Sequence, residues 1–300
     1  MKQVTFTEVA SLREFLESVR ADGKSIAVVP TMGALHEGHL SLVREGVSRA
    51  DVVVVTIFVN PTQFGPHEDF ERYPRDLSGD SALAWGAGAQ VIFAPPVSEM
   101  YPVGEQTRVR VQGVSQGLCG STRPGHFDGV ATVVSKLFNV VGAGVYIFGK
   151  KDYQQWRLIE RLAKDLLFPV EVIGVPTFRE KDGLAMSSRN RFLSTSERQR
   201  ATSISRGLQA TLHSYQGGEK RPERLLEIAL KFLEDAKLSP DYVELCNPDT
   251  LAKVEVPTDD PYLLAVAARL GETRLIDNIV LSPLTKDIVQ LPSDSATRNL

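Results

Sequence analysis

Two histidines three residues apart follow a short β-branched run near the N-terminus. They lie in the stretch Pro30 to Leu40, PTMGALHEGHL, as His36 and His39, with Gly33 and Gly38 beside them. Residues three apart at a helix start share one face, so both imidazoles could donate hydrogen bonds to one ligand. A phosphate group is such a ligand, because helix N-termini attract anions. A partial metal site or a pair of surface histidines is the alternative that these two residues leave open.

A second group of polar residues lies far downstream, at Met186-Ser187-Ser188-Arg189. Two hydroxyls, adjacent backbone N–H groups and a guanidinium can hold a triphosphate and follow its charge into a transition state. Gly183, just before them, permits a sharply turned loop. The alternative is a polar linker that ends one domain. We interpret Ser194, a few residues later, as the N-cap of the next helix.

Two further polar groups each follow an apolar run. Gly149-Lys150-Lys151-Asp152 comes after a run that ends at Phe148, and lysines with a carboxylate suit phosphate and ribose recognition. Asn60 and Gln63 follow the strongest apolar run, and their amides could bind a small organic acid. A solvated charge run or a plain turn would look similar. Because parallel strands end at the same edge of a sheet, we expect both groups near the histidines.

The elements that would position these residues alternate between strands and helices. Apolar runs predict strands at 26–29, 51–59, 90–94, 145–148 and 170–175, and helical periodicity predicts helices at 8–20, 40–49, 78–88, 127–141 and 153–165. This alternation predicts an α/β fold, a Rossmann-like doubly wound parallel sheet with helices on both faces. Arg123 and His126, in RPGHF before the fourth helix, either act in the site or only end a loop.

The character of the chain changes after about residue 190. Two helices are predicted at 195–214 and 222–237, followed by strands at 241–246, 262–268 and 273–280 without helices between them. This order predicts a smaller C-terminal α+β domain. We therefore divide the chain into a domain at 1–185, a second at 186–284 that could act as a lid, and a poorly ordered tail at 285–300.

Composition narrows the class of protein. The net charge of −3 and the pI of about 6.0 over 300 residues do not favour binding to nucleic acid or to acidic membranes. The N-terminus lacks a basic region followed by an apolar run, and no apolar stretch approaches the roughly 18 residues of a membrane span. Cys119 and Cys246 match no metal or redox spacing. These features predict a cytoplasmic enzyme.

Taken together, the motifs resemble a known family. His36-Glu37-Gly38-His39 is similar to the HIGH signature of the nucleotidyltransferase superfamily, and Met186 to Arg189 is similar to its KMSKS-type loop. The segments PTMGALHEGHLSLV, IFVNPTQF, RPGHF, VSKLFN, GKKDYQQ, DGLAMSSRN and RLIDN together resemble the pantoate–β-alanine ligase family. They follow that family's order and cover roughly residues 25–280.

The resemblance implies a C–N bond-forming ligase of pantothenate and coenzyme A biosynthesis. ATP and (R)-pantoate would give pantoyl adenylate and diphosphate, with Mg2+. The amine of β-alanine would then attack the adenylate, releasing AMP and pantothenate. The resemblance also implies a homodimer.

The resemblance further implies roles for individual residues. Catalysis would fall to His39 as proton donor, to His36 on the phosphates, and to Lys151. The implied ATP-binding residues are Met32, Gly33, Ala34, Leu35, His36, Glu37, Gly38, His39, Gly149, Lys150, Lys151, Asp152, Phe178, Met186, Ser187, Ser188 and Arg189. Gln63, Gln155 and Asn60 would bind pantoate or β-alanine. Asp80 is a candidate Mg2+ contact, with an ordinary carboxylate on a helix surface as its alternative.

Two other functions would share some of these sequence features. Another adenylate-forming enzyme of the same superfamily would share the motifs. An aminoacyl-tRNA synthetase, however, would need a tRNA-binding domain and usually a basic face, for which the acidic chain after Arg189 leaves little room. A nucleotide-binding regulatory protein could keep the pocket and lose the chemistry. Loss of His39, Lys151 or the 186–189 group would favour it, and all of them are present.

Overall fold

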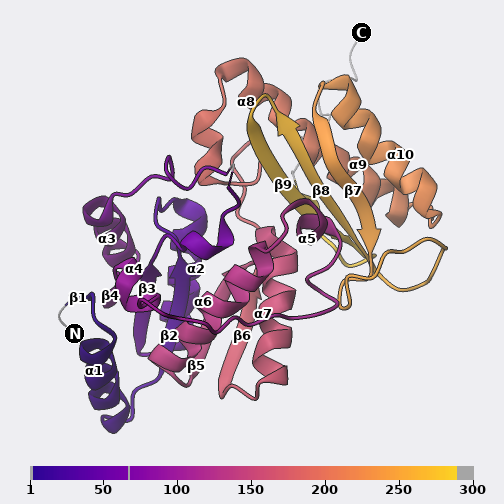
Figure 1. Ribbon diagram of the computed structural model, residues 1–300. Coiled ribbons are helices and arrows are strands. Elements are labelled where there is room, and N and C mark those ends of the chain that lie inside the picture. Colours follow the sequence, from indigo (N-terminus) through magenta and orange to yellow (C-terminus); the bar gives the residue numbers. More distant parts are fainter. Residues whose placement is uncertain (1–2, 67, 289–300) are drawn as a thin grey trace, which may run out of the picture. The chain divides into compact units, whose positions relative to one another are not determined.

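The computed structural model describes residues 3–66 and 68–288, which form two compact units (Figure 1). The first unit contains the chain up to Phe178 together with Met186–Ser188. The second contains Arg179–Ala185 and the chain from Arg189 onward. The chain therefore passes between the units more than once, whereas the sequence suggested a single boundary at residue 185.

Six parallel strands form the sheet of the first unit. They are β1 (Val4–Phe6), β2 (Ile26–Thr31), β3 (Val52–Ile57), β4 (Val91–Phe93), β5 (Gly144–Gly149) and β6 (Val170–Val175), in the spatial order β1-β4-β3-β2-β5-β6. Each neighbouring pair runs parallel. The predicted doubly wound α/β fold is confirmed. The short edge strand β1 was not predicted, because three residues are too few to show a periodicity.

The central strands form because β-branched side chains can be buried on both faces of the sheet. Val52 to Val55 have no exposed surface, and β2 is buried over the same length. The two strands pair from Ile26 opposite Val52 to Thr31 opposite Ile57. A continuously apolar run of this kind is typical of a parallel strand with helices on both sides.

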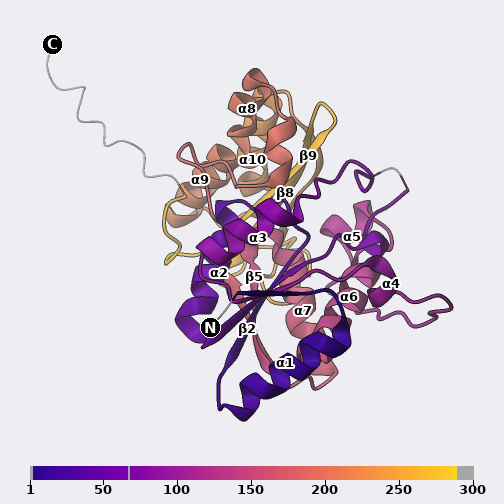
Figure 2. The same ribbon diagram turned by 90° about the vertical axis from the view of Figure 1, so that its left-hand side faces the viewer.

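Helices cover both faces of this sheet. They are α1 (Val9–Ala21), α2 (Glu37–Arg49), α3 (Leu77–Gly86), α4 (Val97–Met100), α5 (Leu118–Thr122), α6 (His126–Val141) and α7 (Tyr153–Asp165), with the short 3-10 turns η1 (Pro61–Gln63) and η2 (Lys150–Asp152). Helices α2 and α3 contact each other on one face, while α6 contacts both α1 and α7 on the other (Figure 2).

The strand order creates a switch point between β2 and β5. From β2 the chain moves outward in one direction through β3 and β4, and β5 and β6 lie on the other side of β2. Connections that leave neighbouring strands for opposite faces open a crevice at the strands' carboxyl ends, where ligands of such folds bind. The segments that leave these two strands are Met32–His36 and η2, which are the segments singled out from the sequence.

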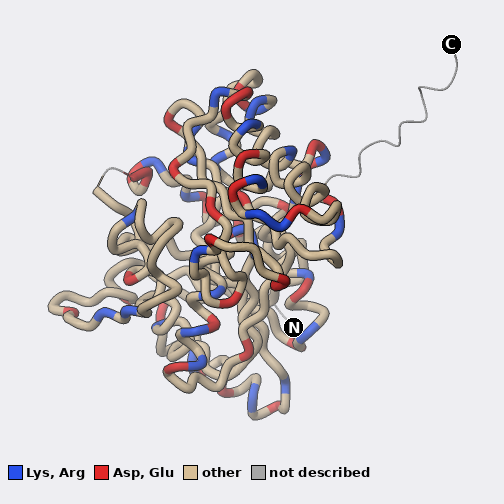
Figure 3. Tube along the Cα trace, turned by 90° about the vertical axis from the view of Figure 1, so that its right-hand side faces the viewer, with Lys and Arg blue, Asp and Glu red and all other residues tan. Residues whose placement is uncertain are grey.

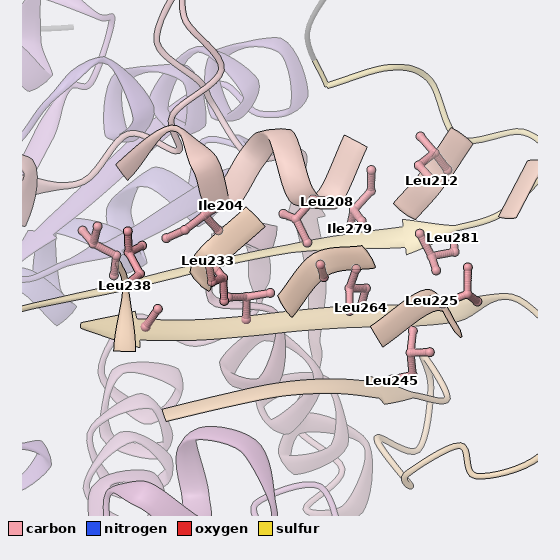
Figure 4. Close-up of a cluster of buried hydrophobic side chains, with 14 of the residues drawn as sticks. Ile204, Leu208, Leu212, Leu225, Leu233, Leu238, Leu245, Leu264, Ile279 and Leu281 are labelled. Carbon is pink, nitrogen blue, oxygen red and sulfur yellow. The ribbon is translucent and has the colours of Figure 1, made fainter. Parts of the chain in front are cut away.

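The second unit packs three helices on an antiparallel sheet. The helices are α8 (Thr195–Ala201), α9 (Ser203–Gln216) and α10 (Pro222–Asp235), and the strands β7 (Ser239–Cys246), β8 (Tyr262–Leu270) and β9 (Thr273–Leu281) lie in the order β7-β8-β9. Leu208, Leu233 and Leu264 belong to the buried cluster between helices and sheet (Figure 4). The predicted α+β unit is confirmed, although the helix expected at 195–214 is divided at Thr202.

Two polar contacts join distant segments of the second unit. Arg179 makes a bidentate ion pair with the buried Asp277 of β9, at 2.6 and 2.9 Å, which holds the start of the segment before Met186. Asp287 accepts a hydrogen bond from Gln209 Nε2 (2.6 Å). Residues 285–288, which the sequence predicts as part of the tail, are therefore tied to α9. The rest of the predicted tail, 289–300, lies outside the described residues.

The lengths of the helices and the positions of the charged residues can be followed along the described chain. Among residues 3–66 and 68–288, no helix is long and apolar enough to cross a membrane. Lys and Arg are interspersed with Asp and Glu over the trace (Figure 3).

Candidate active site

A left-handed turn connects β2 to α2. Gly33 and Ala34 have φ values of 83° and 52°. The Ala34 and Leu35 N–H groups donate to the two carboxylate oxygens of Asp80, at 2.9 and 2.7 Å. A Cβ atom on Gly33 would lie 2.8 Å from the same carboxylate, so glycine is needed both for φ and for space. Asp80, on α3, therefore fixes the conformation of the turn that directly precedes His36.

This placement does not support Asp80 as a Mg2+ ligand. Mg2+ binds carboxylates in near-octahedral sites that keep several waters. Asp80 is only 4% exposed, and both of its oxygens accept backbone N–H groups. It is not an ordinary surface carboxylate either. Within the described ranges, no group of three or more His, Cys, Asp or Glu side chains is arranged to hold a metal ion.

The two histidines stack on each other at the start of α2. Their ring centroids are 4.1 Å apart, and the His36 N–H points to His39 Nδ1 at 3.3 Å. Because His39 Nδ1 faces a donor, it carries no proton, and the proton of the neutral ring lies on Nε2. His39 therefore offers an N–H donor rather than a second acceptor.

Burial keeps His39 uncharged. Burial, and after it the neighbouring His36, lowers the pKa of His39 from 6.5 to about 3. Asp152 acts in the opposite sense and Lys151 in the same sense, so both charges lie within electrostatic reach of the ring. The structure thus brings His36, His39, Lys151 and Asp152 into one site. Near neutral pH, His39 is a hydrogen-bond donor rather than an imidazolium acid.

Met186 joins this site from far along the chain. The Gly38 N–H, in the first turn of α2, lies 3.3 Å from the Met186 sulfur, and Met186 N donates to the Phe178 carbonyl at 3.0 Å. Ser187 and Ser188 belong to the same unit, whereas Arg189 belongs to the second. A thioether is a weak acceptor, so this helix N-terminus has a donor that an anion would satisfy better.

The two lysines that follow β5 have different partners. Lys151 Nζ lies 3.7 Å from Asp152 Oδ2. The Lys150 ammonium lies over the Trp156 ring, 4.5 Å from its centroid, where a cation–π contact holds it. Gln155 is half-buried in the first turn of α7.

Gln63 connects the predicted acid site to the histidine segment. Its Nε2 lies 3.2 Å from the Met32 sulfur, and its Oε1 accepts a hydrogen bond from Asn60 Nδ2 at 3.0 Å. The residue closes η1, directly beyond β3. The weak sulfur acceptor leaves the amide N–H group available to a better one.

Asn60 is enclosed by protein groups and contacts Gln63. Its side chain is enclosed, with 1% of the residue exposed. Its Oδ1 accepts from Thr62 N (3.3 Å), Thr62 Oγ1 (2.9 Å) and the Tyr101 hydroxyl (2.8 Å). Its Nδ2 donates to Gln63 and to the Gly129 carbonyl (3.2 Å). Each polar atom of the Asn60 side chain thus already has a protein partner, which favours a supporting role, and the predicted direct contact with substrate stays a prediction.

Arg123 and His126 hold the backbone of Gln63. His126 Nδ1 donates to the Gln63 carbonyl at 2.8 Å, and Arg123 donates to His126 Nε2 at 3.0 Å. Arg123 also pairs with Glu68 at 2.6 Å. Burial, followed by the Arg123 charge, lowers the pKa of His126 to about 4. These contacts favour a supporting role for Arg123 and His126.

Gln154 is a supporting residue that sequence reasoning missed. Its Oε1 accepts from Cys119 N (3.0 Å), and its Nε2 points to the carbonyls of Val114, Gln116 and Gly117. It therefore fixes the segment 114–119 against α7. The one signal in the sequence that separates Gln154 from Gln155 is that Gln154 falls on the apolar face of the predicted helix.

The chain matches known proteins along nearly its whole length. Residues 4–280 match the model of the family described as pantoate-beta-alanine ligase. A pantothenate synthetase of Myxococcus xanthus is 53% identical over 94% of this chain and 97% of its own. Pantothenate synthetase 1 of Bradyrhizobium diazoefficiens is 51% identical over 92% of this chain and 97% of its own.

Solved structures agree with these matches. The crystal structure of a pantothenate synthetase from Thermus thermophilus has a TM-score of 0.87 at 43% identity, covering 96% of this chain and 100% of that one. The ligase of Francisella tularensis, complexed with beta-gamma ATP and β-alanine, has a TM-score of 0.74 at 31% identity, covering 93% and 97%.

We predict that Asp80→Asn lowers the free energy of unfolding by about 1–3 kcal/mol, because its NH2 group would face one of the two backbone donors. Asp76→Asn is the control on the same helix, since Asp76 is the N-cap of α3 and accepts from Gly79 N. Asparagine caps a helix about as well as aspartate, so that change should cost no more than about 0.5 kcal/mol. Urea unfolding measures both. Equal losses in the two variants would remove the special role of Asp80.

We also predict that stability falls as the pH drops from 6.5 toward 4. Unfolded His126 binds a proton near pH 6.5, whereas the folded residue does so only near 4. The unfolded state therefore binds more protons in this window, and the shift corresponds to at most about 3 kcal/mol. His126→Asn should make the decrease shallower, leaving the contribution of His39. Unfolding free energies at several pH values measure this slope, and an unchanged slope would contradict the assignment.

Proposed function

This chain belongs to the pantoate–β-alanine ligase family, and we propose that it activates pantoate as a pantoyl adenylate before joining it to β-alanine. The ATP-dependent reaction forms a C–N bond and gives pantothenate. The proposal concerns the intermediate and the residues that carry each step.

The chemistry requires activation because a carboxylate is a poor electrophile. In the first step a pantoate carboxylate oxygen would attack the α-phosphorus of ATP, and the bond from that phosphorus to the diphosphate oxygen would break. In the second step the β-alanine nitrogen would attack the acyl carbon, the bond to AMP would break, and the nitrogen would lose a proton. Negative charge develops on phosphoryl oxygens in the first step, so positioned donors are the main catalytic resource.

The contact between Gln63 and Met32 carries this proposal. The Gln63 amide nitrogen lies 3.2 Å from the Met32 sulfur, at the start of the segment that leads to His36 and His39. A small acid held by Gln63 would thus lie beside the predicted phosphate site. Two substrates must be neighbours for an in-line attack, and this arrangement supplies that proximity.

The phosphate site would use the N-terminus of α2. The Gly38 N–H is met by a thioether and His39 presents its Nε2–H, so phosphate oxygens would give the Gly38 donor a stronger acceptor than the one present and would also accept from His39. Lys151 would add positive charge within reach of His39. The bound triphosphate would raise the pKa of His39, because negative charge favours the imidazolium. Any protonation of His39 would then strengthen its hydrogen bond to the phosphate, because charge-assisted hydrogen bonds are the stronger ones.

Three further features concern the metal ion, the location and the oligomeric state. The described residues offer no protein-built cage for Mg2+, so we assign the ion no residue and no step. We infer a cytoplasmic location, which agrees with two buried cysteines that form no disulfide. A homodimer is expected from the family resemblance, and light scattering of the purified protein would measure its mass.

We predict that the protein catalyses exchange between diphosphate and ATP when pantoate is present and β-alanine is absent. An adenylate can form and reverse without the amine, so labelled diphosphate should enter ATP. Omitting pantoate is the control and should abolish exchange. Exchange with an unrelated acid but not with pantoate would refute the substrate, and absence of exchange despite pantothenate production would refute the adenylate.

We predict that His39→Ala slows adenylation by about 100- to 1000-fold, the usual effect of losing one preorganised donor. His39→Gln should retain more activity, because its amide nitrogen can replace the Nε2–H donor. Single-turnover formation of pantoyl adenylate measures both rates. Equal rates for the two variants would show that hydrogen-bond donation is not the function of His39.

A further inference from the structure

Neighbouring groups fix the backbone of Gln63 on two sides. Its backbone carbonyl accepts from His126 Nδ1 at 2.8 Å. Helix α6 also packs directly on η1, since a Cβ atom on Gly129 would lie 2.7 Å from Gln63 N. With the backbone fixed, the main choice left is which end of the amide points to Asn60. That choice decides whether a substrate meets a donor or an acceptor.

Asn60 makes this choice, because its own orientation is set by backbone groups. The Gly129 carbonyl can only accept, so the atom facing it must be Nδ2, at 3.2 Å. The Thr62 N–H can only donate, so the atom facing it is Oδ1, at 3.3 Å. Asn60 therefore presents an N–H to Gln63, whose Oε1 accepts it at 3.0 Å. The amide nitrogen of Gln63 is left on the side of Met32.

Tyr101 completes this arrangement from outside the known motifs. It directly follows α4, and its hydroxyl donates to Asn60 Oδ1 at 2.8 Å and lies 3.1 Å from Thr62 Oγ1. The ring lies 6.2 Å from that of Phe58, and Lys136 Nζ lies 4.4 Å from its centroid. The Tyr101 hydroxyl is thus placed to hold the Asn60 amide and is itself occupied by Asn60 and Thr62.

We propose that Tyr101 is a positioning residue, which through Asn60 holds Gln63 with its amide nitrogen, and not its oxygen, toward the acid substrate. The inference rests on the proposed function, because it assumes that Gln63 binds pantoate. It makes Gln63 a donor that selects an oxygen acceptor on the substrate. The Met32 sulfur, a weak acceptor, would be exchanged for that oxygen at a gain.

The test measures the dissociation constant of pantoate by calorimetry, in the presence of a nonhydrolysable ATP analogue. Tyr101→Phe keeps the ring and removes only the hydroxyl, so it should weaken pantoate binding roughly 3- to 10-fold. Affinity for the ATP analogue should stay unchanged. Tyr146→Phe is the matched control, since its buried hydroxyl bonds to the carbonyls of Leu137 and Gly142 and has no contact with Gln63. It should leave pantoate binding unchanged.

A double-mutant comparison separates positioning from a general structural effect. In a Gln63→Met background, which has no amide to orient, Tyr101→Phe should not weaken pantoate binding further. Gln63→Glu should bind pantoate more weakly than Gln63→Met, because a carboxylate cannot donate. The proposal is overturned if Tyr101→Phe has no effect, if its effect persists in the Gln63→Met background, or if Gln63→Glu binds as well as the wild type. Absence of pantoate binding to the wild type would instead refute the proposed function.

Discussion

The site depends first on the two hydrogen bonds that the Ala34 and Leu35 N–H groups donate to Asp80. A non-glycine residue with positive φ costs of order 1 kcal/mol, and Ala34 has such a conformation. The carboxylate offsets that cost by satisfying two buried donors at once. In consequence the chain turns sharply beyond β2, and α2 begins with its N-terminus and the histidines on the ligand side of the sheet.

Burial then decides what the histidines can do. An imidazole enclosed beside a second imidazole loses its charged form, and the hydrogen bond to its Nδ1 selects the tautomer. The same physics acts on His126, whose two ring nitrogens are occupied by a carbonyl acceptor and a guanidinium donor. Neutral histidines are thus used as oriented hydrogen-bonding groups, and the positive charge near His39 comes from Lys151.

Two methionine sulfur atoms contact N–H donors of this site. Gly38 N–H and Gln63 Nε2 are the donors that would serve the nucleotide and the acid, and each lies against a methionine sulfur, of Met186 and Met32 respectively. A thioether covers a donor without competing strongly for it. Both donors are therefore kept from other strong protein acceptors and would pair better with substrate oxygens. A substrate oxygen would replace only a weak contact, so little interaction energy with the sulfur would be lost on binding.

Local sequence determined the elements and most of the site's location. β-branched runs such as 52–57 favour strands buried on both faces. The histidine pair, Gln63 and the 186–189 segment each stand at a break in the apolar pattern, which makes them visible in the sequence. The motif resemblance identified the family, which the comparisons confirmed. Periodicity, however, shows which face of an element is buried, and it does not show which distant polar group that face will meet.

Tertiary structure alone decided those long-range contacts. Asp80 reaches the turn from 45 residues away, Tyr101 reaches Asn60 across 41, and His126 reaches Gln63 across 63. The sequence suggested a metal contact for Asp80 and a substrate contact for Asn60, because a carboxylate or an amide near a site can serve either purpose. Only packing shows that their atoms are already paired. A hydrogen bond depends on ångström-scale distances between elements, and those distances arise only when the helices close over the sheet.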